Sequence, residues 1–487
     1  MVERWDALYV DGEWREPESG EYAPVEDPAT GAHFAEAPVG TAADVDAAIR
    51  AAKRAYDREW RNWNADDRAS VLRELSVVLA DHREEIVRLE TRENGKPLGE
   101  SESDVDSAIA SLEYYAGAAN KHYGNTLPTH DGVMRMTLYE PYGVVGTIIP
   151  WNWPPMHVVD FLAPILAAGN TMVLKPAPET PLCALRIAEL FDGVLPDGVF
   201  NVVTGGTEPG VALTGHPDVG KLAFTGNSET GKKVMAAAAE NVTPTMLELG
   251  GKNANIYFED AALDRAIPAV VSSCFYNAGE ACSSSERLLV QESIHDAFVE
   301  RFVEGTSELV VGHGEDPKTD LGPLSSRKQY EKVREYIEIG QAEGATLAYR
   351  GETPDDPDLD GGYYVAPHVF TGVTEEMRLF QEEVFGPVIA ISSFETEKEA
   401  VDLSNSVKYG LNGAVWTDDA RRAMRVTNRL EVGRVFVNTN SRGGKGAPMG
   451  GYKQSGIGRK HAFRETLREF TRLKTVRYGT GSDVRTM

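Results

Sequence analysis

The chain has 487 residues, of which 41% are hydrophobic, so it is too long for one ordinary core and is expected to form two or three domains. It carries 75 acidic against 49 basic residues and a net charge of −26, with an isoelectric point near 4.9. Such a charge repels phosphates and acidic headgroups, which argues against nucleic acid and anionic membranes as partners.

Most of the basic residues are Arg rather than Lys. An acidic surface with few Lys residues is typical of a salt-rich cytoplasm, so we expect a halophilic source, with an ordinary acidic enzyme as the alternative. The N-terminus has no basic and then apolar signal region, and no uncharged apolar run reaches membrane-spanning length. A cytoplasmic protein is therefore expected.

Three cysteines, Cys183, Cys274 and Cys282, are too few for a disulfide framework and odd in number. The sequence has no C-x-x-C pair and no cluster of Cys and His, so no metal site is predicted. Cys183 and Cys274 stand in apolar helical contexts, and we interpret both as buried thiols.

The first 120 residues divide into two parts. Residues 1–40 have many Gly and Pro residues among short alternating stretches, which predicts small strands in an irregular segment. Residues 41–120 are predicted to be helical, because apolar side chains recur on one face with a period of about 3.6 residues. Two such faces are marked by Ala47, Ala48, Ala51, Ala52, Tyr56 and Trp60, and by Leu72, Leu75, Val78 and Leu79.

After residue 143, short apolar strands alternate with helices, which indicates a parallel α/β sheet. The first set of predicted strands is 144–149, 171–174, 199–203 and 222–224, with a helix over 156–168. A second set begins after Gly250 and Gly251 and comprises 255–258, 287–290, 388–392, 413–416 and 434–438. The acidic stretch 351–361 is predicted to be a solvated loop.

Two stretches near the middle of the chain carry residues suited to chemistry on a carbonyl group. Leu247–Lys252 places Glu248 just before a Gly-Gly turn, and Phe275–Cys282 ends on a cysteine after Gly-Glu-Ala. A thiolate can attack an aldehyde and a carboxylate can activate water, which together would yield an acid. Each residue alone has a simpler interpretation, Cys282 as a buried apolar thiol and Glu248 as a charge at a strand edge.

Further polar residues follow the predicted strands. Pro150–Pro154 contains Asn152, whose amide could donate to an oxyanion, although a Pro-bounded turn is the alternative. Lys175 ends the next strand, and its alternative is a solvated charge. Phe224–Gly231 joins a strand to a helix and leaves backbone N–H groups for a phosphate, although a plain helix cap explains it as well. Because ligands of open parallel sheets lie beyond the strand ends, the clustering strengthens each signal.

From about residue 7 to residue 478 the chain resembles the aldehyde dehydrogenase superfamily. The motifs that carry the resemblance, in the order and spacing of that family, are Pro150–Pro154, Leu247–Lys252, Gly279–Cys282, Glu383–Pro387, Pro448–Gly456 and Leu473–Val476. It implies an α/β fold with a Rossmann-like cofactor domain, an α/β catalytic domain and a small β oligomerisation element. The implied division is 1–121 and 141–250 for cofactor binding, 251–440 for catalysis, 122–140 and 470–487 for oligomerisation, and 441–469 as a return to the cofactor domain and active-site rim.

The resemblance implies NAD(P)-dependent oxidation of an aldehyde to a carboxylic acid through a thiohemiacetal and a thioester on Cys282. Asn152 would hold the oxyanion, and Glu248 would activate the water that releases the acid. The residues implied to bind NAD or NADP are Trp151, Lys175, Gly210, Gly226, Asn227, Gly231, Leu249, Glu383 and Phe385.

Two alternatives to this function stay open. A CoA-acylating aldehyde dehydrogenase would pass the thioester to coenzyme A, but that type usually lacks the base, so Glu248 argues against it. A catalytically silent binding or structural protein could keep the fold without the chemistry. The presence of Cys282, Glu248 and Asn152 together argues against that reading.

The chain departs from the family pattern near the cofactor and near the base. Where many relatives have a Glu that binds the adenosine ribose, this chain has Pro178, so both NAD and NADP are expected to bind, unless Glu208 restores a preference for NAD. Some relatives hold a Lys–Glu pair thought to relay the proton of the base, and those positions are Phe161 and Lys460 here. Asn227 replaces a more usual Ser, with little expected effect because both cap helices.

The substrate pocket is expected to draw on Trp153, Met156, His157, Ala281, Ser283 and the loop 440–446. Two cations and three Gly residues in that loop are compatible with an anionic semialdehyde, but a flexible surface loop explains them at least as well. The resemblance also implies a homodimer or homotetramer, built through the hairpin near 122–140 and a strand near 470–480.

We predict that the thermal midpoint and the activity rise with KCl and that low salt loosens the assembly. The net charge of −26 repels itself most at low ionic strength, where the Debye length is about 30 Å at 0.01 M against about 3 Å at 1 M. Thermal melts, activity assays and sizing runs at about 0.05 M and about 2 M KCl test this. An unchanged midpoint and elution volume would show that the acidic surface has no part in stability.

Overall fold

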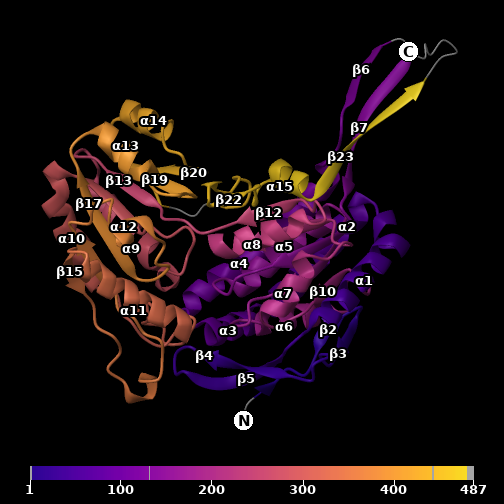
Figure 1. Ribbon diagram of the computed structural model, residues 1–487, viewed down its shortest axis with the longest axis horizontal. Helices are drawn as coiled ribbons and strands as arrows, with labels where there is room; N and C mark the ends of the chain where they lie inside the picture. The colour runs from indigo at the N-terminus through magenta and orange to yellow at the C-terminus, as the bar shows by residue number, and fades with distance from the viewer. Residues whose placement is uncertain (1–2, 131, 441–443, 480–487) are drawn as a thin grey trace.

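The computed structural model describes residues 3–130, 132–440 and 444–479. Figure 1 shows two lobes, each built around a sheet, and a slender β arm that extends from one of them. The α/β fold predicted from the sequence is confirmed. No helix within the described residues is long and apolar enough to cross a membrane.

One lobe is built around an eight-stranded sheet with the order β22-β12-β11-β8-β9-β10-β2-β3. Its strands are β2 (Leu8–Val10), β3 (Glu13–Arg15), β8 (Val144–Ile148), β9 (Thr171–Lys175), β10 (Phe200–Val202), β11 (Lys221–Thr225), β12 (Thr245–Glu248) and β22 (Gly456–Ile457). The strands from β8 to β12 are parallel, with β9 and β10 on one side of β8 and β11 and β12 on the other. This reversal creates a crevice beyond the ends of β8 and β11, where open sheets bind ligands.

Helices cover both faces of this sheet, because its buried strands present apolar side chains to each side. One face packs against α1 (Ala42–Arg58), α7 (Thr207–Thr214) and α8 (Ser228–Ala239). The core on the other face includes α2 (Ala65–Asp81), α3 (Arg83–Asn94), α4 (Leu98–Ala118), α5 (Pro154–Ala167) and α6 (Leu182–Phe191). The helical character predicted for 41–120 and 156–168 is confirmed.

The other lobe is built around a seven-stranded sheet with the order β15-β16-β17-β14-β13-β19-β20. Its strands are β13 (Ala254–Tyr257), β14 (Arg287–Gln291), β15 (Thr346–Arg350), β16 (His368–Thr371), β17 (Val388–Phe394), β19 (Asn412–Trp416) and β20 (Arg434–Val437). One face packs against α9 (Leu263–Phe275) and α10 (His295–Ser307), and the other against α11 (Arg327–Ala342), α12 (Arg378–Gln381), α13 (Glu397–Asn405) and α14 (Ala420–Thr427).

Every strand predicted in the two sets is present, with ends within two residues of the expected ones. The sequence pattern missed β12 and β16, which are four residues long, β15, whose residues are all exposed or half-buried, and β22, which has two residues. None of them has the continuous apolar run by which buried parallel strands are recognised.

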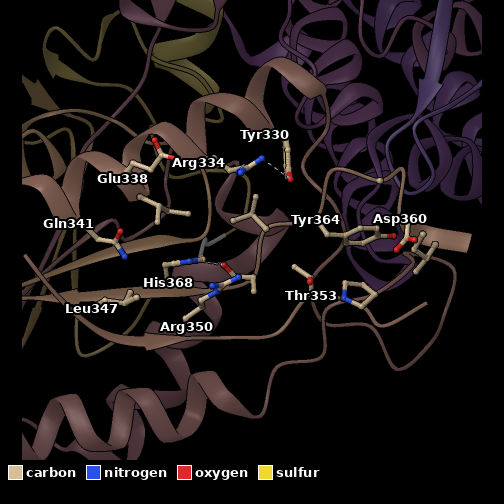
Figure 2. A pocket seen from close by; sticks show the side chains of 16 residues that line it. Tyr330, Arg334, Glu338, Gln341, Leu347, Arg350, Thr353, Asp360, Tyr364 and His368 are labelled. Carbon is tan, nitrogen blue, oxygen red and sulfur yellow. Dashed lines mark hydrogen bonds between the residues drawn. The ribbon is translucent and has the colours of Figure 1, made fainter. Parts of the chain in front are cut away.

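The predicted solvated stretch 351–361 is mostly exposed and contains one short turn, η5 (Pro357–Leu359). Figure 2 shows the hollow that this loop forms with α11, a cavity of about 500 Å³ whose wall includes Tyr330, Arg334 and His368. None of the residues predicted to be catalytic lines this hollow. The predicted chemistry therefore lies elsewhere.

The arm is an antiparallel sheet of β6 (Thr126–His130), β7 (Val133–Pro141) and β23 (Thr471–Gly479), on which Leu138, Leu473 and Tyr478 are exposed. The remaining described elements are β1 (Glu3–Arg4), β4 (Tyr22–Asp27), β5 (Ala32–Pro38), β18 (Tyr409–Gly410), β21 (Tyr452–Lys453), α15 (Phe463–Glu469), η1 (Trp60–Asn62), η2 (Ala119–Lys121), η3 (Tyr276–Gly279) and η4 (Glu292–Ile294).

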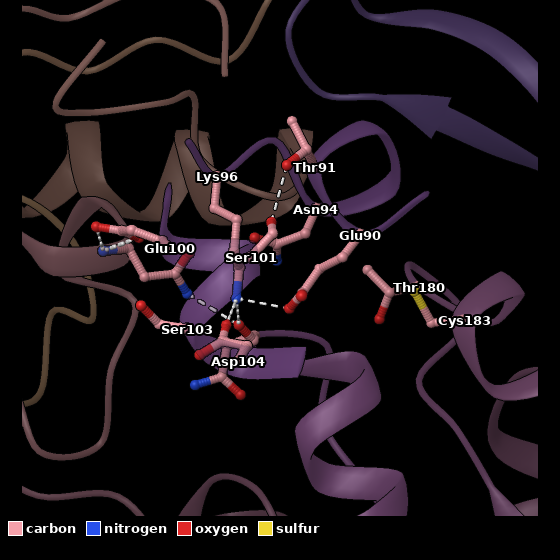
Figure 3. Close-up of polar contacts among 12 residues, drawn as sticks. Glu90, Thr91, Asn94, Lys96, Glu100, Ser101, Ser103, Asp104, Thr180 and Cys183 are labelled. Carbon is pink, nitrogen blue, oxygen red and sulfur yellow. Dashed lines mark hydrogen bonds and ion pairs between the residues drawn. The ribbon is translucent and has the colours of Figure 1, made fainter. Parts of the chain in front are cut away.

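A buried ionic cluster lies where α3 passes into α4, and Figure 3 shows the Lys96 amine between Glu90 and Asp104. Lys96 Nζ lies 2.9 Å from Glu90 Oε1 and 2.6 Å from Asp104 Oδ2. It also donates to the backbone carbonyl of Asn152, at 2.8 Å, just beyond β8. Burial raises the pKa of Glu90 well above its usual value, against the opposing charge of Lys96. The cluster thus connects the helical layer to the end of a central strand.

We predict that Lys96→Met lowers the free energy of unfolding by about 3–5 kcal/mol, because it leaves buried carboxyl groups without their counter-charge. Urea denaturation at neutral pH measures the change. Lys398→Met is the control, since it removes an exposed pair with Asp402 and should cost less than about 1 kcal/mol. Equal effects of the two substitutions would contradict the role assigned to the cluster.

Candidate active site

A cavity of about 520 Å³ lies at the crevice beyond β8 and β11 and is lined by residues of both lobes. Most of the predicted site residues line it, namely Trp151, Asn152, Lys175, Gly226, Asn227, Glu248, Leu249, Cys282, Glu383 and Phe385. Gly231 packs behind Leu249, and Gly210 lies in α7 near Ile148. These two glycines are close to the wall of the cavity without being among the described residues that line it.

Cys282 follows a tight turn with an unusual backbone. The three residues 277–279 have φ angles of 51°, 51° and 78°, in the left-handed region that side chains rarely adopt. Such a run persists only where its surroundings hold it. Here the backbone N–H of Asn277 donates to the Glu100 carboxylate, and its side-chain amide donates to the Asn152 carbonyl at 3.0 Å. The turn that carries Cys282 is therefore fixed to the end of β8.

The Cys282 side chain is buried in the wall of the cavity and only 7% exposed. Burial raises the pKa of its thiol to about 12, the Glu248 carboxylate adds to this effect, and Lys460 opposes it. In this arrangement the thiol is neutral, so attack requires a base. Cys183 and Cys274 are completely buried and do not line the cavity.

Asn152 is held from both its backbone and its side chain. Its carbonyl accepts from Lys96 and Asn277, and its Nδ2 donates to the carbonyl of Glu280 at 2.9 Å. An amide nitrogen has two protons, so one N–H remains for a ligand in the cavity. Asn152 can therefore serve as a positioned donor for a developing oxyanion.

Glu248, at the end of β12, is buried beside the cavity and forms an ion pair with Lys460. Glu248 Oε2 lies 3.2 Å from Lys460 Nζ, and the two side chains are 3% and 4% exposed. Lys460 Nζ also lies 5.9 Å from the ring centroid of Phe161. The two positions that depart from the family pattern thus meet beside the base, which the sequence alone did not indicate.

The turn from β11 into α8 forms one wall of the cavity. Asn227 caps the helix, and its side chain accepts from the backbone N–H of Thr230 at 2.8 Å. A Cβ on Gly231 would lie 2.6 Å from a methyl carbon of Leu249, so only glycine allows α8 this close to the strand ends. Free N–H groups at this helix start suit a phosphate.

Lys175, at the end of β9, lines the same cavity, and burial lowers its pKa to about 8 against the opposing charge of Glu179. Pro178 and Glu179 line the cavity beside it. Glu208 is used elsewhere, because its carboxylate accepts from the backbone N–H of Ala42 at the start of α1. The suggested role of Glu208 at the cofactor has no support in this geometry.

A buried pair that sequence reasoning missed supports the segment 383–385. Lys252 Nζ lies 2.6 Å from Glu286 Oε2, and the Glu286 carboxylate accepts from the backbone N–H of Phe385 at 2.9 Å. The Phe385 ring meets the Trp151 ring edge-on at 5.5 Å. Lys252 is the last residue of the motif Leu247–Lys252, and Glu286 lies four residues after Cys282. Their position in or next to these motifs is the signal by which the sequence could have identified them.

The expected substrate residues Trp153, Met156 and Ala281 pack around Cys282 in a small apolar cluster. His157 lines the cavity with both ring nitrogens buried and without a hydrogen-bond partner among the described residues. Burial and the charge of Lys460 lower its pKa well below the usual value, so its imidazole is neutral. The expected substrate residues therefore place a neutral imidazole next to an apolar cluster.

The loop 440–446 lies partly outside the described residues, since 441–443 are not described. Its Lys445 forms a buried ion pair with Asp160, which also lies 2.7 Å from His461. One of the two cations considered for an anionic substrate is therefore already neutralised. No group of three or more His, Cys, Asp or Glu side chains among the described residues is arranged to hold a metal ion.

Comparison with known proteins places this geometry in context. The model of the aldehyde dehydrogenase family matches residues 14–476. The betaine aldehyde dehydrogenase of Bacillus subtilis (strain 168) is 40% identical over 474 residues, which is 96% of each chain. Aldehyde dehydrogenase citD of Monascus ruber is 41% identical over 462 residues, covering 94% of this chain and 91% of that one.

A crystal structure of betaine aldehyde dehydrogenase from Staphylococcus aureus in complex with NAD+ is similar, with a TM-score of 0.95 at 38% identity. The match covers 99% of this chain and 97% of that one. Family model, sequence relatives and solved structure agree over nearly the whole length, and this chain belongs to the aldehyde dehydrogenase family.

Proposed function

We propose that this protein oxidises an aldehyde to a free carboxylic acid with NAD or NADP, through a covalent thioester. The observation that carries the proposal is one cavity lined by a cysteine, a carboxylate and an amide donor, Cys282, Glu248 and Asn152. The experiment is an assay of reduced-cofactor formation with each cofactor over a panel of neutral, anionic and trimethylammonium aldehydes. Formation of reduced cofactor that depends on the aldehyde supports the proposal. Absence of aldehyde-dependent reduction with every member of the panel would contradict it.

The described residues fit a dinucleotide. The start of α8 offers backbone N–H groups for its phosphates, and Lys175, at the end of β9, lines the same cavity. The rings of Trp151 and Phe385 form an apolar wall. Burial and the nearby Glu286 raise the pKa of Glu383 to about 7, and its carboxylate accepts from the backbone of Gly251. When bound, the nicotinamide supplies the acceptor for a hydride.

In the covalent half of the cycle, Cys282 Sγ bonds to the aldehyde carbon. The thiol is neutral, so its proton is released to water in the cleft as the carbon–sulfur bond forms, and Glu248 remains available for the second half of the cycle. The free N–H of Asn152 donates to the oxyanion as it forms. Loss of hydride from the carbon then leaves an acyl thioester on Cys282.

In the second half, Glu248 takes a proton from water, and the hydroxide oxygen bonds to the thioester carbon as the carbon–sulfur bond breaks. A CoA-acylating reaction is the alternative, and a second is a silent binding protein. The burial of Glu248 beside Cys282 favours hydrolysis over both. Adding coenzyme A to the assay distinguishes transfer from hydrolysis, because only transfer yields an acyl-CoA.

We further propose a homodimer or homotetramer, with the arm covered by another copy. The support is the exposure of Leu138, Leu473 and Tyr478 on a sheet of only three strands, which is marginal by itself. The domain division 1–121 with 141–250, 251–440, 122–140 with 470–487, and 441–469 remains part of this proposal. Residues 480–487 of that division lie outside the described structure.

We predict that Cys282→Ala abolishes aldehyde oxidation and retains cofactor binding, because no other described residue that lines the cavity carries a thiol to form the thioester. Steady-state assays and cofactor titration measure the two effects. Cys183→Ala and Cys274→Ala, at buried sites outside the cavity, should keep turnover within a few-fold. Turnover at the normal rate in the Cys282 variant would overturn the covalent mechanism.

We predict that Glu248→Gln still gives a burst of about one reduced cofactor per site and then stalls, since an amide cannot take the proton of water. Rapid-mixing measurement of the burst, followed by the steady state, separates the two halves of the cycle. Loss of the burst together with turnover would instead assign Glu248 to the thiol alone.

A further inference from the structure

Lys460 reaches Glu248 because of strand pairing in the first sheet. β22 pairs antiparallel with β12, with Gly456 opposite Glu248 and Ile457 opposite Leu247. A few residues farther on, the backbone of Lys460 exchanges two hydrogen bonds with Met449, at 2.8 and 2.9 Å. The backbone of Lys460 is therefore fixed, and its long side chain extends to the Glu248 carboxylate at the end of β12.

Lys460 supplies the nearest counter-charge to Glu248 among the described residues. Among the described residues Lys460 is the one cation within ion-pair distance of Glu248, and neither carboxylate oxygen accepts a hydrogen bond from this part of the chain. Arg434 acts on Glu248 from farther away, and its Nε donates to Asn412. A buried carboxylate without a counter-charge or donors tends to take up a proton. A protonated Glu248 could not accept one from water.

The groups around this pair restrict what else could stabilise the charge. They are Cys282 and Arg434 beside Glu248, Glu383 beside Cys282, and Asp160, His157 and His461 beside Lys460. Asp160 is already paired with Lys445 and His461, and burial keeps His157 neutral. The ring of Phe161 faces the Lys460 amine and offers no counter-ion. Among the described residues, Glu248 is thus the one carboxylate next to Lys460 that has no other ion-pair partner.

We propose that Lys460 is a positioning residue that keeps the Glu248 carboxylate ionised and aimed at the cleft, so that hydrolysis of the thioester depends on its positive charge. The inference rests on the proposed function and deepens it. In the step concerned, a water proton passes to Glu248 while the carbon–oxygen bond forms and the carbon–sulfur bond breaks. Glu248 then returns the proton to the Cys282 thiolate, and Lys460 favours the ionised carboxylate that results.

Position 460 also distinguishes this chain from relatives in which a Lys–Glu pair accompanies the base. Here one cation remains, but it comes from the segment after β22 instead of from α5, where Phe161 stands. Loss of the Lys460 charge is expected to slow hydrolysis of the thioester more than thiol attack or hydride loss. Water activation needs Glu248 as a base, and the two earlier steps do not.

The test compares Lys460→Met, Lys460→Gln and Lys460→Arg by rapid-mixing and steady-state assays across pH. Met and Gln should retain a burst of about one reduced cofactor per site. Their steady-state kcat at neutral pH should fall about tenfold or more, with the acid limb of the kcat profile moved to higher pH, because a neighbouring opposite charge changes the proton affinity of a carboxyl group by about 1–3 pH units. Lys460→Arg keeps the charge and should restore most of the turnover.

Lys221→Met is the matched control. Lys221 is also buried, 4% exposed, and pairs with Glu469 at 3.0 Å, but it is the first residue of β11, at the opposite end of that strand from the cavity. It should lower the thermal midpoint as Lys460→Met does and leave the kcat profile unchanged. A general loss of stability would change the thermal midpoint and the kcat profile of both variants alike. The proposed role of Lys460 predicts a shifted kcat profile in the Lys460 variants alone.

Wild-type turnover and an unmoved acid limb in both Lys460→Met and Lys460→Gln would overturn the inference, as would loss of the burst in parallel with turnover. The proposed function is tested separately by Glu248→Gln. If that variant behaves as predicted and the Lys460 variants do not, only the inference about Lys460 fails. If Glu248→Gln loses its burst, the assignment of Glu248 as the base for water is wrong, and the inference about Lys460 fails with it.

Discussion

The backbone carbonyl of Asn152 is where the parts of the site are fixed to one another. It accepts from the Lys96 amine at 2.8 Å and from the Asn277 amide at 3.0 Å, while the Asn152 side chain donates to the Glu280 carbonyl. The end of β8 is thereby joined to the helical layer and to the strained turn that carries Cys282. Because hydrogen bonds weaken steeply with distance and angle, these contacts set the amide donor and the thiol in one register.

The charges around the cavity follow one pattern, in which a buried Lys reaches a carboxylate on another segment. Lys96 lies between two acids, Lys252 meets Glu286, and Lys460 meets Glu248. Removing such charges from water costs free energy, so the pairs add little net stability, but breaking one leaves an uncompensated charge. What the pairs provide is a set of fixed charges, which act more strongly on the thiol and on the base in a buried site than they would in water.

Sequence reasoning was most accurate where a single local property decides the structure. Apolar runs located most strands of both sheets, since burial on both faces requires such runs. It was less informative for charged residues. Lys445 was considered as a cation for an anionic substrate, and it is paired with Asp160. Glu208 was considered for the cofactor site, and its carboxylate accepts a hydrogen bond from the backbone N–H of Ala42 at the start of α1. The destination of a long charged side chain depends on what lies opposite it, and that partner comes from distant parts of the chain.

The sequence by itself determined the α/β fold, the family, and the residue types that belong at the strand ends, because periodicity, glycine turns and ordered motifs are local or spaced along the chain. Only the tertiary structure decided that Asn152 is anchored by Lys96, that the Cys282 thiol is neutral, and that Lys460 faces Glu248. Burial and Coulomb interactions depend on distance in space, and strand pairing such as that of β22 with β12 brings together residues that no sequence pattern connects.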